Sequence, residues 1–305
     1  MISFIIPFST IEKDKFLNLN EKDDLWEEND SANIVYSTIK TIKNINSLKC
    51  DKEILLVDNS HTWPEIELPN VRVIKGWQAL PLEELERIPE YMNHRDIQNS
   101  LDNLGCLTMW VSMAFHLGVQ EAKGEYVVLQ HNDTFYHQDC IDEMIEQIEE
   151  EELEYISVDN KKIWISTYLL NKDFLDKYIK EYSQQPVIIR PENGGYIKTK
   201  KIGFADAYFF LCKRKFFDIY NIDWYYGDTN HGATIYCLYN DLKYLHLGPY
   251  YDNPNWETED TLHTYYYKDE PFLTHLKGGF SENKMSSKDF EEEFNSYLQE
   301  FKNAN

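Results

Sequence analysis

Short apolar runs alternate with segments of helical spacing over the first half of the chain. Four runs of mostly consecutive apolar residues are predicted strands: residues 2–7, 53–57, 71–74 and 125–130. Three segments repeat apolar residues every three or four positions and are predicted helices: Ile34–Ile45, Leu107–Ala122 and Ile141–Ile148. Strand–helix alternation of this kind predicts an α/β fold with a mostly parallel central sheet flanked by helices.

The second half of the chain is less regular. Residues 207–212 form an apolar run, and residues 242–247 are a predicted strand. Ser286 and Asp289 resemble a capping box, so we expect a terminal helix with an aromatic face from residue 290 to 301. Because no repeat or low-complexity linker interrupts the chain, we expect one compact domain followed by a C-terminal extension.

Composition narrows the class of partner. The 305 residues carry a formal net charge of −23, which would repel nucleic acid and anionic lipid. An anionic ligand would therefore need a cation or a local basic patch. The five cysteines are widely spaced without a CxxC pair, which favours a reducing compartment. We find neither a signal peptide nor an apolar run of the roughly 20 residues that span a bilayer, and expect a cytoplasmic location.

The strand at 125–130 runs directly into the polar cluster His131-Asn132-Asp133-Thr134. A carboxylate and an imidazole two residues apart at a strand end can face one divalent metal ion. The alternative is a polar turn in which Asp133 caps the next helix. Two further polar segments follow predicted strands, Pro7-Phe8-Ser9 and Asp58-Asn59-Ser60. Ligands of such sheets gather at the carboxyl ends of the strands, although Asp-Asn-Ser is also a common turn sequence.

The segment AKGEYVVLQHNDT (Ala122–Thr134) resembles the AKGEYVLFLNNDT segment of family-2-like glycosyltransferases of the GT-A fold. LLVDNS, ending at Ser60, resembles a second segment of that family. The resemblance covers roughly residues 1–250 and implies a Rossmann-like GT-A domain. Residues 1–135 would be its nucleotide-binding half and residues 136–250 its acceptor half. Residues 251–305 would be the C-terminal extension; they lie outside the resemblance, which therefore implies no role for them.

The resemblance also implies roles for individual residues. In the nucleotide half, the nucleotide-sugar would contact the following set: Pro7, Ser9, Asp58, Asn132 and Asp133. A Mn²⁺ or Mg²⁺ ion would be held by His131 and Asp133, with His246 in YLHLG as a further ligand. His131 stands where the family usually has Asp or Asn. For His246 a structural role is the alternative.

An inverting transferase needs one carboxylate to take a proton from the acceptor hydroxyl. The segment WYYGDT resembles the family region that carries this base, which implies Asp228; Asp206 is the competing candidate. The expected function is transfer of a hexosyl or pentosyl group from a nucleoside-diphosphate sugar to a glycan or other hydroxyl acceptor. The alternative is a non-catalytic module that binds glycan or nucleotide. A sugar-phosphate nucleotidyltransferase is disfavoured, because such enzymes usually carry a glycine-rich, basic N-terminal loop and the segment directly after Pro7 contains neither glycine nor arginine.

Overall fold

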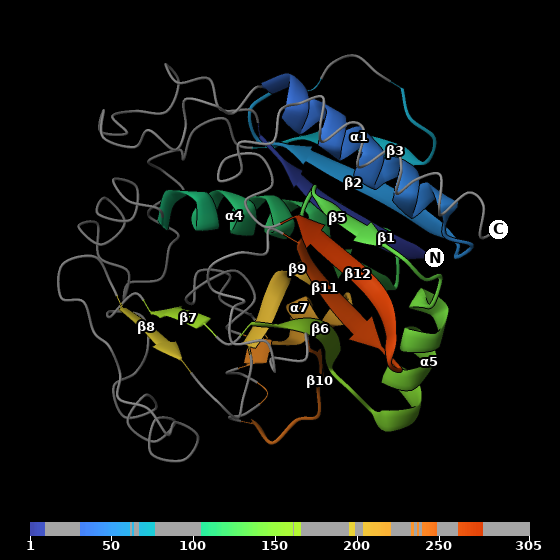
Figure 1. Cartoon of the computed structure of the whole chain (residues 1–305), viewed down its shortest axis with the longest axis vertical. Coiled ribbons are helices and arrows are strands. Elements are labelled where there is room, and N and C mark those ends of the chain that lie inside the picture. Colours follow the sequence, from blue (N-terminus) through green and yellow to red (C-terminus); the bar gives the residue numbers. More distant parts are fainter. Residues whose placement is uncertain are drawn as a thin grey trace.

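Figure 1 shows the computed structural model of the chain. It describes residues 1–9, 31–61, 63, 67–76, 105–160, 162–165, 195–198, 204–220, 233, 234, 237, 240–248 and 262–276. The predicted base Asp228 and the predicted terminal helix lie outside these residues. Within them, no helix is long and apolar enough to cross a membrane.

The main sheet of the described residues has seven strands in the order β10-β6-β9-β4-β1-β2-β3. Their bounds are β1 (Ile2–Phe8), β2 (Lys52–Asp58), β3 (Val71–Lys75), β4 (Tyr126–Leu129), β6 (Tyr155–Asn160), β9 (Phe204–Lys213) and β10 (Leu245–Leu247). All pairs are parallel except the two that β9 makes with β4 and β6. The predicted α/β class with a mostly parallel central sheet is therefore confirmed.

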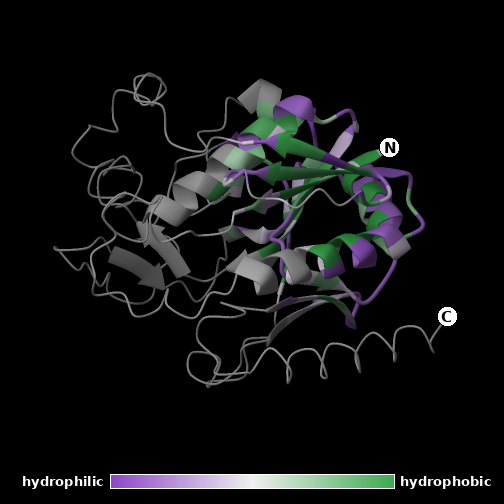
Figure 2. Cartoon of the chain, turned by 90° about the horizontal axis from the view of Figure 1, so that it is seen from above, coloured by the Kyte–Doolittle hydropathy of each residue, from purple (hydrophilic) through white to green (hydrophobic). Residues whose placement is uncertain are grey.

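Helices cover both faces of this sheet: α1 (Ser31–Ser47), α4 (Gly105–Glu121), α5 (Ile141–Glu151) and the short α7 (Lys215–Tyr220). Alternate residues of β1 enter two separate cores. Phe4 packs with residues of α1 and α5, whereas Ile5 packs with residues of α4. Figure 2 shows the apolar strands between the helices, whose polar positions face outwards. Strands buried on both faces explain the nearly continuous apolar runs in the sequence.

The first strand continues one residue further than its sequence predicts. Pro7 lies inside β1, and Phe8 pairs with Asp58 of β2. Proline is tolerated there because the other neighbour, β4, pairs with β1 only as far as Ile5. The lost amide donor of Pro7 therefore interrupts no ladder on the β4 side.

A second, antiparallel sheet has the order β11-β12-β5 and consists of β5 (Thr134–Tyr136), β11 (Leu262–Tyr267) and β12 (Glu270–Leu276). A separate pair is formed by β7 (Lys162–Ile165) and β8 (Gly195–Lys198). Strands β11 and β12 belong to the predicted extension, yet Tyr265 and Phe272 share a core with Phe4. The hairpin thus packs on the main body, while the domain boundary at residue 250 stays a prediction.

Candidate metal centre

Three side chains meet beyond the carboxyl end of β4. His131 and Asp133 lie in the turn between β4 and β5, and His275 lies on β12, where it is paired with Thr134. Each offers one ligand atom, and the three atoms lie within 4.8 Å of one another. Nε2 of His275 is 3.3 Å from Oδ1 of Asp133. Two imidazoles and one carboxylate are therefore within reach of a single ion.

The cluster is largely closed off from solvent. The side chain of His275 is 3% exposed and that of Asp133 is 17% exposed. Oδ1 of Asp133 and Nδ1 of His275 are buried and make no hydrogen bond within the described part of the chain. Buried polar atoms without such a partner cost free energy. A bound cation would satisfy this oxygen, so the residues present fit a divalent metal ion.

The charge of Asp133 also suits a ligand. Burial raises the pKa of this carboxyl, but the charge of His275, whose Nε2 lies 3.3 Å away, and the charge of His131 outweigh burial. The net result is a pKa below the usual value of an aspartic acid. Because metal ligands must be deprotonated, a carboxylate that stays ionised is ready to bind a cation.

Tyr208 of β9 holds the two imidazoles in place. Its ring stacks on His275 with centroids 3.6 Å apart, and it meets the ring of His131 edge to face at 4.9 Å. The sequence does not single out this residue. Asp206, the alternative base, lies two residues earlier on β9, where it is buried and its Oδ1 accepts a hydrogen bond from the amide of Tyr208.

The predicted nucleotide contacts lie at the same edge of the sheet. Pro7 is the second-last residue of β1 and Ser9 directly follows the strand, whose last residue pairs with Asp58 at the end of β2. The buried carboxylate of Asp58 accepts hydrogen bonds from the amide and hydroxyl of Ser60 and from the amide of Trp63, at 2.8–3.0 Å. Asp58 thus organises the turn that follows β2, as the alternative interpretation held. Its contact with a nucleotide stays a prediction.

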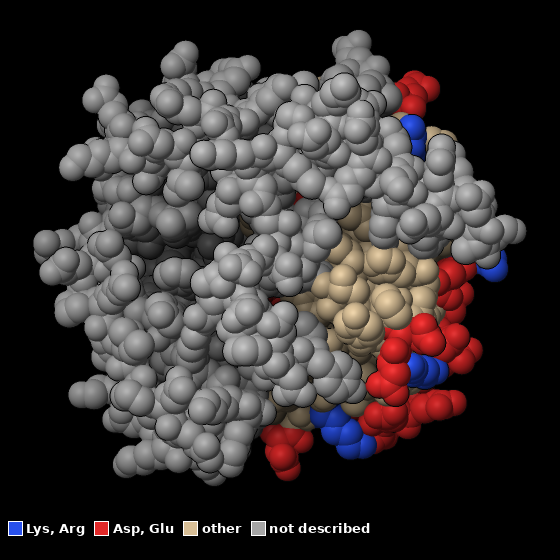
Figure 3. All heavy atoms as spheres, viewed as in Figure 1, with Lys and Arg blue, Asp and Glu red and all other residues tan. Residues whose placement is uncertain are grey.

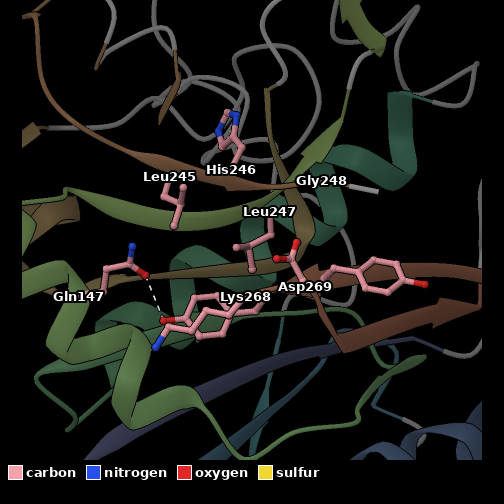
Figure 4. Close-up of a pocket in the computed structure, with 9 residues that line it drawn as sticks. Gln147, Leu245, His246, Leu247, Gly248, Lys268 and Asp269 are labelled. Atoms are coloured by element: carbon pink, nitrogen blue, oxygen red, sulfur yellow. Dashed lines mark hydrogen bonds between the residues drawn. The ribbon is translucent and has the colours of Figure 1, made fainter. Parts of the chain in front are cut away.

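His246 is not brought to the cluster. It lies on the edge strand β10, three strands from β4, which corresponds to roughly 14 Å across the sheet. Its Nε2 lies 3.1 Å from the hydroxyl of Tyr155. It borders a separate cavity of about 380 Å³ beside the turn at residues 266–269 (Figure 4). Of the three predicted metal ligands, the structure therefore groups two, and the third member of the group is His275.

The segment from residue 110 to 218 matches the family model described as glycosyl transferase family 2. It contains β4, the turn with His131 and Asp133, and β9, whereas His275 lies outside it. None of the curated proteins matches the chain.

Among solved structures, the chain is similar to a mannosyltransferase from Pyrobaculum calidifontis in complex with GDP-Man and Mn²⁺. The identity is 12% and the TM-score 0.40, and the match covers 84% of this chain and 59% of that one. The bifunctional IspDF from Campylobacter jejuni is similar at 12% identity and a TM-score of 0.41, covering 81% and 49%. Core-mannan synthase A from Aspergillus fumigatus in its Mn/GDP form is similar at 10% identity and a TM-score of 0.41, and the match covers 77% of this chain and 69% of that one. This chain spans 49% to 69% of the lengths of these structures. The match over residues 110–218 confirms the resemblance that the sequence motifs predict, a similarity to family-2-like glycosyltransferases of the GT-A fold.

Proposed function

We propose that this chain is a metal-dependent glycosyltransferase. It moves a hexosyl or pentosyl group, with inversion, from a nucleoside-diphosphate sugar to a hydroxyl of a glycan or glycoconjugate. The observation that carries this proposal is the cluster of His131, Asp133 and His275 at the end of β4, since two of its residues lie inside the family-2 segment.

The charge of the protein supports a role for a cation. Acidic side chains gather on the face formed by α5 (Figure 3), and the chain as a whole carries −23. A nucleoside diphosphate would be repelled by such a protein unless positive charge were concentrated at the site. An ion held by His131, Asp133 and His275 would supply Lewis-acid chemistry, neutralising the charge of the departing diphosphate.

The proposed roles in binding the nucleoside and in catalysis follow from the position of the cluster at the carboxyl edge of the main sheet. β1, β2 and β4 end side by side, so the segments after them can receive the nucleoside while the cluster receives the diphosphate. Asp228 is the proposed base that deprotonates the acceptor hydroxyl. Asp206 is the alternative base, and its neighbour Tyr208 contacts both imidazoles of the cluster.

Mn²⁺ is expected to bind more tightly than Mg²⁺. Two of the three ligands are imidazoles, whereas Mg²⁺ prefers oxygen ligands in near-ideal octahedral geometry. Isothermal titration of chelator-treated protein with each ion measures both affinities. An equal affinity, or a preference for Mg²⁺, would contradict binding through both imidazoles.

Thermal unfolding with UDP-, GDP-, CDP- and dTDP-compounds, each with and without Mn²⁺, tests the proposed function. A ligand at about 100 times its dissociation constant stabilises a protein by ~2.7 kcal/mol. The unfolding midpoint should then rise by several degrees, at roughly 2–4 °C per kcal/mol. We expect such a shift for one nucleotide class, dependent on Mn²⁺. No shift with any nucleotide would favour the non-catalytic alternative, in which donor hydrolysis is also absent.

A further inference from the structure

Helix α1 carries a stripe of polar side chains on its buried side. The stripe consists of Ser37, Thr38, Thr41 and Asn44, each at most 5% exposed. Thr38, Thr41 and Asn44 follow one another at intervals of three residues, and Ser37 lies four residues before Thr41, which places all four on one side of the helix. Neighbouring positions of α1, such as Ile42 and Ile45, are apolar core residues. Because a buried polar group needs a hydrogen-bonding partner, the contacts of this stripe indicate what it holds.

The first three residues of the stripe hold the turn that bears the metal ligands. The carbonyl oxygen of Asn132 accepts hydrogen bonds from the hydroxyls of Thr41 and Ser37, at 2.8 and 3.3 Å. The side-chain amide of Asn132 donates to Oγ1 of Thr38 at 3.0 Å. Asn132 stands between His131 and Asp133, so both its backbone and its side chain are fixed to α1 while its two neighbours meet His275.

Asn44 holds the strand that follows. Its Oδ1 accepts a hydrogen bond from the amide of Tyr136 at 2.7 Å, and its Nδ2 donates to the carbonyl of Tyr136 at 3.1 Å. This pair of bonds is the one that a residue of an adjacent antiparallel strand would make. β5 thus lies between α1 and β12 (Figure 1), and its other edge pairs Thr134 with His275.

We propose that Thr41 and Asn44 are positioning residues that set the geometry, and thereby the metal affinity, of the cluster. Thr41 fixes the turn that carries His131 and Asp133. Asn44 fixes β5 in the register that places His275 opposite that turn. Neither residue belongs to the cluster itself, so both act through the backbone that they hold. This inference rests on the metal site of the proposed function.

The test measures the Mn²⁺ affinity of the chelator-treated protein by isothermal titration and the spectrum of bound Mn²⁺ by electron paramagnetic resonance. Thr41→Val removes the hydroxyl at nearly constant volume, and Asn44→Ala removes both bonds to Tyr136. We expect each to weaken Mn²⁺ binding about 10-fold or more, as for other groups that orient metal ligands, and to change the spectrum. Thr41→Ser keeps the hydroxyl and should therefore keep the wild-type Mn²⁺ affinity and spectrum.

Asn46 provides the matched control on the same helix. Its amide also makes a hydrogen bond to a distant backbone carbonyl, that of Pro69 at 2.9 Å, but on the exposed side away from the turn. Asn46→Ala is expected to keep the wild-type Mn²⁺ affinity, whatever its effect on the unfolding midpoint in chelator. An equal loss of affinity in Asn46→Ala would show that general destabilisation explains the effect and would overturn the inference.

Two further outcomes separate the inference from the proposed function. If the wild-type protein itself does not bind Mn²⁺, the metal site fails and the positioning role fails with it. If the wild type binds but Thr41→Val and Asn44→Ala bind equally well, the positioning role alone is wrong. If Thr41→Val does not fold, Ser37→Ala replaces it, since this change removes the longer hydrogen bond to the carbonyl of Asn132. Ser37→Ala is expected to weaken Mn²⁺ binding by a smaller factor. An unchanged Mn²⁺ affinity in both Ser37→Ala and Asn44→Ala would overturn the inference.

Discussion

Asp133→Ala is expected to reduce sugar transfer at least about 100-fold while leaving the fold intact. Asp133 is the single carboxylate of the cluster, and without it two neutral imidazoles would have to hold the ion. A catalytic metal supplies several kcal/mol of charge stabilisation in the transition state. Since each ~1.4 kcal/mol corresponds to a tenfold change in rate, loss of the ion accounts for that factor. Steady-state kinetics with the donor class found by thermal unfolding measures it.

Asp139→Ala is the matched control for this change. Asp139 is an exposed carboxylate six residues further along, and its Oδ2 accepts a hydrogen bond from the amide of Lys49 rather than facing the cluster. We expect its transfer rate to stay near that of the wild type. The Mn²⁺-dependent stabilisation by nucleotide should vanish in Asp133→Ala and persist in Asp139→Ala. A wild-type rate in Asp133→Ala would end the metal assignment.

Local patterns of the sequence predict most of the main sheet. β1, β2, β3 and β4 lie within one or two residues of their predicted bounds, because central strands of a parallel sheet are continuous apolar runs. The same patterns place His131, Asp133 and Asp58 at the carboxyl edge, since the edge follows from strand direction alone. These predictions need no knowledge of which distant segments pair.

The third member of the cluster could not be predicted in this way. His275 is far from Asp133 in the sequence and reaches it through the antiparallel pairing of β12 with β5. The sequence motif points to another histidine, His246, because Tyr244–Gly248 resembles the histidine-containing segment of the family. Strand pairing separates His246 from the cluster, because β10 is the far edge of the main sheet, three strands from β4.

The polar stripe of α1 shows a second limit of periodicity. Thr38 falls on the apolar face of the predicted helix, and the helical pattern treats it as one more small core residue. In the structure it is fully buried but accepts a hydrogen bond from the amide of Asn132. A threonine at a core position can serve packing or hold a loop, and the sequence contains no signal that separates the two. Only the hydrogen-bond partner distinguishes the two roles, and this partner, Asn132, lies 94 residues away in the sequence.

His275→Ala is expected to weaken Mn²⁺ binding at least about 10-fold and to lower transfer with it, whereas His246→Ala should keep the wild-type Mn²⁺ affinity. His275 is in contact with Asp133, while His246 contacts Tyr155 on another part of the sheet. The factor expected for His275 is at the lower end of the 10–100-fold loss seen when even the groups behind metal ligands are removed. Isothermal titration of both variants compares the two histidines directly.

The pair of variants also tests what the C-terminal hairpin contributes. His275 is largely buried and stacked on Tyr208, so His275→Ala leaves a cavity and is expected to lower the unfolding midpoint even in chelator. His275→Gln fills more of that space without restoring an imidazole, and should recover stability but not Mn²⁺ affinity. Recovery of both would mean that His275 supports the site by packing alone. Recovery of stability alone would mean that residues outside the family-2 segment complete the metal centre, which then forms only when β12 is paired with β5.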